Sequence, residues 1–490
     1  MINQSVRDKY TVVIGLEVHA QLLTRSKIFN SDESLYGGAP NTHVGVITLA
    51  HPGTLPRLNK LAVEHAIKMG IACHSEISRF QIFDRKNYFY PDLPKGYQIT
   101  QDRTPICKGG YITIKPKEGQ PTAIALNRIH LEEDAGKSIH LENETDTLVD
   151  FNRAGVALIE IVTNPVIRNS EDAATLLSEI RKLVRYLDIC DGNMEEGSLR
   201  CDANVSVMLN DAKELGKKVE VKNMNSFRHV QRAIDYEVER QIERLEKGEP
   251  VISETRTYNV ADGKTYGMRT KEELNDYRYF PDPDLSPVEI SEEWLKKIES
   301  AMPALPRELL RKFTTHYALP EYDALILTET KEMAAFFEEL CSFNQLYKEN
   351  SNWLMGPVKA YLNEMNLDLK DFPVSTPKLA ELISLVNRRH FSYTVALQEI
   401  FPRLIQSPHL NILQLSEELN LIQSRDQDFI NTIIENVIKE FPLKVEEYQN
   451  GKKGIISMFM GEVMKRSNGK VDPKATNEML VKKLNEIVIR

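Results

Sequence analysis

The sequence predicts an α+β protein in which a mixed-sheet domain is followed by helical domains, and three observations lead to this fold class. Up to about residue 290, alternating strand patterns, Gly/Pro turns and two helices are mixed without a regular βαβ repeat. Beyond residue 293 the apolar residues recur at helical spacing. A chain of 490 residues is also longer than one hydrophobic core usually supports, so we expect two to four domains.

Four segments of the first part are predicted to be β-strands. In residues 11–22 the even-numbered side chains from Val12 to Leu22 share an apolar face, and Glu17 and His19 lie on the other. The other three segments are residues 123–137, which run into an acidic turn, 199–207 and 218–222. Each sets charged or amide side chains beside an apolar face, so we expect one sheet with one polar face.

Two helices are predicted in the same part of the chain, over residues 170–187 and from residue 227 to Gly248, the second capped by Asn225 or Ser226. Three prolines between residues 280 and 287 then break regular structure, and a second break falls at residues 406–409. The predicted domains are therefore a mixed-sheet domain, a helical middle domain and a small all-helical tail domain, at residues 1–292, 293–405 and 406–490.

The composition favours a cytoplasmic protein that does not enter a membrane. The five cysteines are isolated, form no C-x-x-C pair and leave an odd one over, which argues against a disulfide framework and against a structural zinc. No apolar run approaches the ~18 residues of a membrane span, and the N-terminus lacks signal or transit character.

The charge is unevenly distributed along the chain. From Gly451 to Arg490, nine Lys or Arg residues stand against four Asp or Glu, so this tail carries +5 and the rest of the chain –14. Such an imbalance is typical of a segment that binds the backbone of RNA. A solvated helical face is the alternative interpretation.

The sharpest chemical signal is the acidic turn from His130 to Ser138. It ends in Gly-Lys-Ser like a P-loop, but Leu131 stands where the first glycine belongs, and three carboxylates stand where backbone amides would cradle phosphate. We expect instead that carboxylates hold Mg²⁺, which in turn holds phosphate. The residues predicted to form this metal floor are Glu17, His19, Glu132, Glu133, Asp202 and Glu220. The neighbours Glu132 and Glu133 can both reach it only if the chain bulges or turns there.

Residues 84–98 are predicted to form a loop, here called the aromatic loop, that interleaves four aromatic rings with three cations around two prolines and a glycine. Such a segment suits stacking on a nucleobase and neutralising phosphate. A surface loop whose rings pack on its own domain is the alternative, and residues 276–283 can be interpreted in the same two ways.

Several motifs together make the chain resemble the B-subunit family of the bacterial aspartyl/glutamyl-tRNA amidotransferase, over essentially all of its length. The motifs are Gly15-Leu-Glu-Val-His19, Asp84-Arg-Lys-Asn-Tyr-Phe-Tyr-Pro91, Leu131-Glu-Glu-Asp-Ala-Gly-Lys137, Glu195-Glu-Gly-Ser-Leu-Arg-Cys-Asp-Ala-Asn204, Lys222-Asn-Met-Asn-Ser-Phe227, Asp276-Tyr-Arg-Tyr-Phe-Pro281, Ser351-Asn-Trp-Leu-Met355 and Gly469-Lys-Val-Asp-Pro473. In combination they are far more specific than any one of them.

The resemblance implies a cradle-like first domain that uses ATP and Mg²⁺ to phosphorylate the side-chain carboxylate of Glu misacylated on tRNA(Gln), or of Asp on tRNA(Asn). Ammonia from a partner glutaminase, the A subunit, then reaches the acyl phosphate through an internal channel. The heterotrimer is completed by a small C subunit, and the tail grips tRNA. The chain itself has no G-x-S-x-G elbow and no H-E-x-x-H motif, which fits an amidase activity carried by another chain.

The resemblance also implies roles for individual residues. It assigns the metal site to the six floor residues and catalysis to Glu17, His19, Glu132 and Glu133. Contacts to nucleotide phosphate, adenine, the 3′-terminal adenosine or the channel mouth are implied for Lys86, Lys95, Tyr88 and Tyr90. Contacts to tRNA are implied for Lys465, Arg466, Lys470 and Lys474.

Two reservations follow from the sequence. A non-catalytic tRNA-binding scaffold, whose polar sheet face is only solvated, remains an alternative function. Some relatives also carry cysteines between the first strand and the Pro52-Gly53 turn, but residues 30–36 of this chain contain none, so we expect no zinc there.

Overall fold

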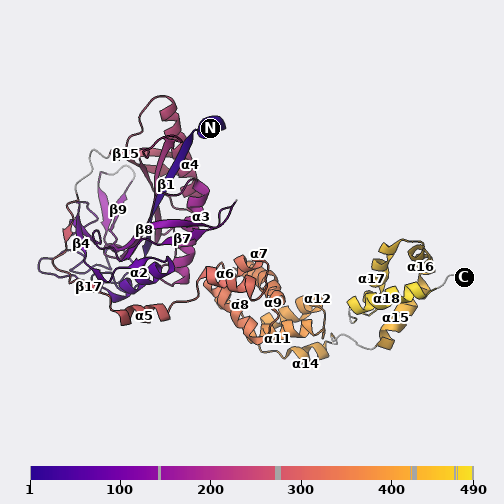
Figure 1. The fold of residues 1–490 in the computed structure, drawn as a ribbon. Coiled ribbons are helices and arrows are strands. Elements are labelled where there is room, and N and C mark those ends of the chain that lie inside the picture. Colours follow the sequence, from indigo (N-terminus) through magenta and orange to yellow (C-terminus); the bar gives the residue numbers. More distant parts are fainter. Residues whose placement is uncertain are drawn as a thin grey trace. The chain divides into compact units, whose positions relative to one another are not determined.

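The chain forms two compact units, Met1–Pro306 and Arg307–Arg490 (Figure 1). The computed structural model describes residues 2–117, 119–141, 145–270, 277–419, 421, 427–467, 471 and 473–487. Within these ranges no helix combines the length and the apolar character that crossing a bilayer requires. The α+β fold class predicted from the sequence is confirmed, because a mixed sheet occupies the first unit and helices make up the second.

A ten-stranded sheet organises the first unit, and all four predicted strands belong to it. Its neighbours run in the order β15-β14-β13-β12-β1-β11-β8-β6-β2, with β7 also paired to β8. The pair β13–β14 is parallel and the other pairs are antiparallel. The strand bounds are β1 Tyr10–Gln21, β2 Glu76–Ile77, β6 Cys107–Lys108, β7 Tyr111–Ile114, β8 Thr122–Glu133, β11 Ala157–Thr163, β12 Leu199–Leu209, β13 Val219–Lys222, β14 Glu254–Asn259 and β15 Lys264–Thr270.

One face of this sheet is buried under helices. Helix α3 (Ser170–Tyr186) contacts β1 and β7, helix α4 (Phe227–Glu246) contacts β12 and β15, and helix α2 (Lys60–Ala72) contacts β8 and β11. Both predicted helices are confirmed, with the side chains of Asn169 and Ser226 capping α3 and α4. The even-numbered apolar residues of β1 join the resulting core, which leaves the odd-numbered side chains on the opposite face.

Smaller sheets lie around the main one. The first contains β16 (Phe280–Pro281), β4 (Asp84–Asn87) and β5 (Tyr97–Thr100), and β5 contacts β8 of the large sheet. The others pair β10 (Thr147–Asp150) with β9 (Lys137–His140) and β17 (Val288–Glu289) with β3 (Phe80–Gln81), and helix α1 (Gln4–Arg7) precedes β1. The predicted aromatic loop is therefore a strand, a turn and a second strand.

The first unit extends beyond the predicted boundary at residue 292. Helix α5 (Glu292–Ser300) packs on α2, and its Leu295 and Ile298 belong to the core of the first unit. The indole nitrogen of Trp294 donates a hydrogen bond to Glu64 at 2.9 Å. The prolines between residues 280 and 287 interrupt regular structure without ending the domain.

The second unit is helical. Its earlier elements are α6 Pro306–Thr315, α7 Glu321–Leu327, α8 Lys331–Phe343, α9 Tyr347–Trp353, the π-helix η2 Leu354–Val358, α10 Lys359–Met365, the 3-10 helix η3 Leu369–Asp371, α11 Thr376–Asn387, α12 Tyr393–Val395, the π-helix η4 Ala396–Ile400, α13 Phe401–Gln406 and α14 Ile412–Glu418. Helix α14 contacts η4, so the predicted break at residues 406–409 falls before a helix that still packs on the preceding ones.

The last helices share a hydrophobic core of their own, formed by residues between Ile430 and Leu484. They are α15 Gln427–Glu440, α16 Pro442–Gln449, the 3-10 helix η5 Lys453–Ile455, α17 Ile456–Arg466 and α18 Pro473–Glu486. Buried Phe459, Val463 and Leu480 pack together in this cluster. An all-helical tail with its own core is thus present in the part of the chain from residue 427 onward.

A buried ionic network ties α4 to the outer strands of the large sheet. The fully buried carboxylate of Glu237 accepts hydrogen bonds from Arg240 at 2.7 Å, from Gln241 at 2.8 Å and from Thr265 of β15 at 3.0 Å. Arg256 of β14 lies 3.5 Å from the same carboxylate. The network therefore holds β14, the neighbour of β13, and the outermost strand β15 against α4.

We predict that Glu237→Ala lowers the free energy of unfolding of the first unit by about 3 kcal/mol, because it removes a fully buried carboxylate and leaves the guanidinium groups of Arg240 and Arg256 to share Glu254. The chain has two tryptophans, so in a Trp353→Phe background the fluorescence of Trp294 reports on the first unit during urea unfolding. The control is Glu243→Ala at an exposed position of the same helix. Equal midpoints for both variants would contradict the prediction.

Candidate functional site

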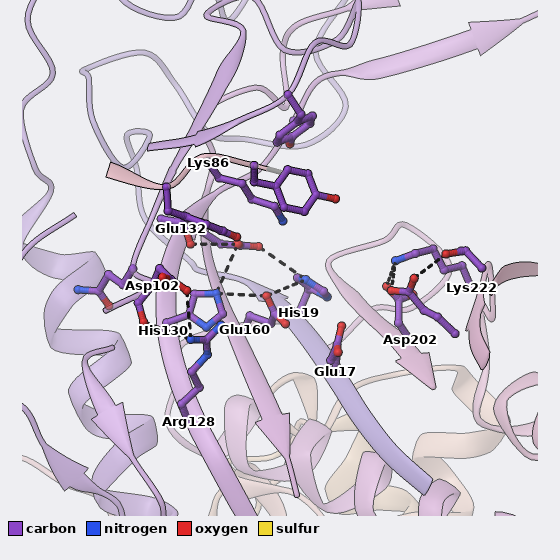
Figure 2. A pocket seen from close by; sticks show the side chains of 18 of the residues that line it. Glu17, His19, Lys86, Asp102, Arg128, His130, Glu132, Glu160, Asp202 and Lys222 are labelled. Carbon is purple, nitrogen blue, oxygen red and sulfur yellow. Dashed lines mark hydrogen bonds and ion pairs between the residues drawn. The ribbon is translucent and has the colours of Figure 1, made fainter. Parts of the chain in front are cut away.

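The register of the sheet brings charged residues from five strands onto its uncovered face. Glu17 of β1 lies opposite Asp202 of β12, and His19 lies between Arg200 of β12 and Glu160 of β11. The next pairings place Glu160 opposite His130 of β8, and Asn204 opposite Glu220 of β13. Since alternate residues share a face, these side chains make up one polar floor, of which Figure 2 labels Glu17, His19, His130, Glu160 and Asp202.

Two groups on this floor have the composition of metal sites. The first, the His19 cluster, contains His19, Glu132 and Glu160, and the second, the Glu17 cluster, contains Glu17, Asp202 and Glu220. In each cluster every residue offers one ligand atom, and these atoms lie within 4.8 Å of one another. The structure therefore brings together five of the six predicted floor residues.

The two clusters lie in one cavity of about 550 Å³. In Figure 2, Lys86 lies above the floor formed by His130, Glu160, His19 and Glu17. Further residues that line the cavity are Tyr88, Tyr90, Asp92, Thr100, Gln101, Asp102, Arg128, Tyr277, Tyr279, Lys218, Lys222 and Thr255. The cavity thus has an acidic floor and a roof of aromatic rings and a cation.

In the His19 cluster, the half-buried carboxylate of Glu160 lies between the imidazole of His19 and that of neighbouring His130. Glu160 lies 3.5 Å from His19 and 3.2 Å from His130, and Glu132 lies 3.6 Å from each imidazole. Burial disfavours the imidazolium forms, but Glu160 and Glu132 outweigh it, raising the pKa of His19 and raising that of His130 to about 9. Burial likewise opposes ionisation of Glu160, yet the two histidines hold its pKa well below the usual value.

The Glu17 cluster is more open and is held by hydrogen bonds from its neighbours. Asn204 donates to Glu17 at 2.8 Å and Thr255 donates to Glu220 at 2.9 Å. Burial, with Glu160 nearby, raises the pKa of Glu17. Burial has the same tendency at Glu220, but Lys222 outweighs it and lowers the pKa of that carboxyl.

Lys86 and its tyrosines form the roof. The ammonium of Lys86 lies 4.8 Å from the ring centroid of Tyr277 and 5.8 Å from that of Tyr88. Burial opposes its charge, but Tyr279 and Glu132 raise the pKa of Lys86, and burial raises the pKa of Tyr88. The pairing of β16 with β4 brings residues 277–279 to this roof, so both predicted aromatic segments contribute to it.

The prediction that Glu133 joins the same floor is corrected by the structure. Strand β8 remains regular there, with Glu132 opposite Leu158 and Glu133 opposite Ala157, so the two side chains point to opposite faces. Glu133 accepts a hydrogen bond from the backbone of Ile99 at 2.8 Å and pairs with Lys95. Both Glu133 and Lys95 line a second, smaller cavity instead of the acidic one.

The sequence interpretation missed a central strand and its chemistry. Strand β11 separates β1 from β8 and supplies Glu160, while His130, Arg128, Tyr277 and Lys222 complete the cavity wall. A signal for Glu160 was present, because a single carboxylate interrupts the otherwise apolar run from Ala157 to Val162. A carboxylate on a buried strand needs a hydrogen-bonding or cationic partner, because an unpaired buried charge is strongly unfavourable.

The predicted tRNA contacts occupy the last helices. Lys465 and Arg466 end α17 and Lys474 lies at the start of α18, and all three are exposed. Arg466 forms an ion pair with Glu440 at 2.5 Å, and this carboxylate partly neutralises the charge of the guanidinium group. Lys470 lies outside the described residues.

Convergent ionisable groups with shifted pKa values in one concave cavity define the site of an enzyme. Residues 12–296 match the family model described as the GatB/GatE catalytic domain, and residues 335–484 match the GatB domain model. The chain belongs to the B-subunit family of the aspartyl/glutamyl-tRNA(Asn/Gln) amidotransferases, which confirms the resemblance seen in the sequence.

Relatives named as the B subunit of this amidotransferase match almost the whole chain. The protein of Thermodesulfovibrio yellowstonii is 46% identical over 98% of this chain and 100% of its own length. Those of Thermoanaerobacter pseudethanolicus and Clostridium botulinum are 45% and 43% identical, with the same coverage. The match extends over both compact units, and the name of these relatives denotes one subunit of a larger enzyme.

A lysine beside the smaller cavity is unusually placed. Lys27 is fully buried, and its ammonium donates hydrogen bonds to the backbone carbonyls of His43 at 2.7 Å and Phe151 at 3.4 Å. Burial lowers its pKa to about 8, although Asp32 and Glu133 act in the opposite direction. The charged form is therefore less favourable in the folded protein than in the unfolded chain.

We predict that Lys27 makes the first unit more stable as the pH rises. Between its folded pKa of about 8 and its higher unfolded value the unfolded chain binds more protons, so raising the pH from 8 to 10 should add about 2 kcal/mol. Lys27→Met should lose this pH-dependent gain, whereas Lys108→Met at an exposed position should keep it. Urea unfolding across this pH range measures it, and equal slopes for Lys27→Met and the parent chain would disprove it.

Proposed function

We propose that this chain is the subunit of a tRNA-dependent amidotransferase that converts Glu-tRNA(Gln) to Gln-tRNA(Gln), Asp-tRNA(Asn) to Asn-tRNA(Asn), or both. Its partners are the glutaminase, which is the A subunit, together with a small C subunit, and its co-substrate is ATP. The observation that supports this is the presence of two ligand clusters side by side on one sheet face, within the region that matches the catalytic-domain model.

The donor atoms of the Glu17 cluster fit Mg²⁺. Glu17, Asp202 and Glu220 offer carboxylate oxygens, which are the ligands that this ion prefers, and the cavity leaves room for substrate phosphates to complete its coordination. The His19 cluster offers two carboxylates and one imidazole and suits a second, less oxygen-selective site. When bound, the ion neutralises the charge on the transferring phosphoryl group.

The remaining groups perform binding and positioning. Lys86 and Arg128 face the cavity as cations for the nucleotide phosphates and the side-chain carboxylate, while Tyr88 and Tyr90 provide rings for adenine or the 3′-terminal adenosine. A carboxylate oxygen of the aminoacyl group attacks the γ-phosphorus, and ADP leaves. Positioning and charge neutralisation provide most of the catalysis in such a transfer.

In the second step ammonia attacks the carbonyl carbon of the acyl phosphate, the C–O bond to phosphate breaks, and an ionised floor carboxylate accepts the proton that the nitrogen loses. Glu133 and Lys95 lie on the opposite face of β8 from the floor, beside the smaller cavity. We assign this pair to the route by which ammonia enters. Thus Glu133 retains a role in delivering the nucleophile, in place of the metal ligation predicted for it.

We predict that Glu132→Gln and Asp202→Asn, one in each cluster, lower the ATP- and tRNA-dependent formation of Gln-tRNA by about a hundredfold or more. Each change removes a ligand charge while keeping the shape of the side chain. The assay follows labelled Glu-tRNA(Gln) with the assembled subunits, and Glu289→Gln at an exposed position is the control. Glutaminase activity and assembly should persist; full amidation by either variant would favour the non-catalytic scaffold.

We also predict that deleting residues 427–490 weakens tRNA binding and reduces its dependence on salt, because basic groups that release counterions from RNA are removed. A cut at residue 427 removes the tail core as a whole, whereas a cut near Val445 would divide it. Binding of tRNA(Gln) measured at several salt concentrations tests this, with glutaminase activity as the control. An unchanged salt slope would exclude the tail as the RNA contact.

A further inference from the structure

Lys222 occupies the place of a cation in the Glu17 cluster. Its ammonium lies 2.5 Å from a carboxylate oxygen of Asp202 and 3.0 Å from one of Glu220 (Figure 2). A Mg²⁺ ion bound by these two residues needs their oxygens at about 2.1 Å and would lie close to this ammonium. Two cations cannot share so small a space without strong repulsion, so the lysine and the ion compete for the same ligands.

The side chain of Lys222 has room to leave. Its side chain is 33% exposed, whereas those of Asp202 and Glu220 are 16% and 20% exposed, so of the three it has the most open space to move into. Lys222 is the last residue of β13, and it lines the large cavity itself. Hydrogen bonds from Thr255 to Glu220 and from Asn204 to Glu17 hold two of the three carboxylates in place without it.

The cluster needs a counter-ion whenever the ion is absent. The three carboxylates repel one another, because their ligand oxygens lie within 4.8 Å of each other. Without a cation, the carboxylates would either take up protons or move apart. The ammonium of Lys222 prevents both. If it leaves, it needs a new anionic partner, and the phosphates of a nucleotide in the same cavity can provide one.

We infer that Lys222 is a resident counter-ion that a divalent cation must displace, so that the Glu17 cluster binds free metal poorly and binds metal together with a phosphate-bearing nucleotide well. The inference rests on the proposed function, because it takes the Glu17 cluster as the metal site. It adds that tight metal binding requires the nucleotide, because the phosphate of the nucleotide pairs with Lys222 once the metal has displaced it. Metal binding and nucleotide binding are therefore coupled through one side chain.

The test measures Mn²⁺ binding to the full-length chain by electron paramagnetic resonance, with and without ADP. Lys222→Met should bind free Mn²⁺ at least about tenfold more tightly than the parent chain, and should gain less affinity when ADP is added. Lys222→Arg, which keeps the charge and the donors, should behave like the parent chain.

Lys218→Met is the matched control, since Lys218 is an exposed lysine of the same cavity outside the Asp202–Lys222–Glu220 contact. If Lys218→Met tightens Mn²⁺ binding as much as Lys222→Met does, the effect is only long-range charge and the inference fails. It also fails if Lys222→Met leaves free Mn²⁺ binding unchanged or weaker.

A second comparison separates this failure from failure of the proposed function. Asp202→Asn should abolish the Mn²⁺ binding that responds to Lys222. If Asp202→Asn alters neither Mn²⁺ binding nor amidation, the cluster is not a metal site and the proposed chemistry is wrong there. If Asp202→Asn abolishes binding while Lys222→Met has no effect, only the counter-ion role is overturned.

Discussion

The register of β1 between β12 and β11 is the constraint on which the rest of the site depends. Eleven consecutive residue pairs join β1 to β12, and five join it to β11. A shift by one residue would turn Glu17 and His19 into the core and bring Leu16 and Val18 to the cavity. The apolar face prevents such a shift, because its side chains are buried in the core of the first unit, where α3 packs on β1. The hydrophobic core thus sets the chemistry of the opposite face.

The second constraint is electrostatic. Where carboxylates from neighbouring strands meet on one sheet face, their negative charge must be balanced by nearby positive groups. The cavity balances it in two ways. At the His19 cluster, the imidazoles of His19 and of neighbouring His130 flank Glu160 and keep it ionised. In the Glu17 cluster a lysine ammonium bridges Asp202 and Glu220. One half is compensated by imidazoles that are at most 19% exposed and the other by an ammonium that is 33% exposed, so the second half is the better place for an exchangeable ion.

The fold was predictable where the pattern was local. Alternation identified four strands, and spacing with caps identified α3 and α4, because each signal is complete within one segment. Strand β11 was missed because it is buried on both edges between β1 and β8 and is short and mostly apolar. Because the strand was not predicted, Glu160 was not predicted as a site residue either. The boundary near residue 292 was placed too early, since contacts with distant α2 hold α5 in the first unit.

The sequence by itself determined the family, the four main strands and most of the acidic residues that face the cavity, because strand alternation and the motifs are properties of the chain. Only the tertiary structure decided how these residues are grouped. It separated Glu133 from Glu132 by the pleat of β8, inserted Glu160 between two histidines, and placed Lys222 among its carboxylates. Which side chains meet depends on strand order and register, and these are set by packing between segments far apart in the sequence.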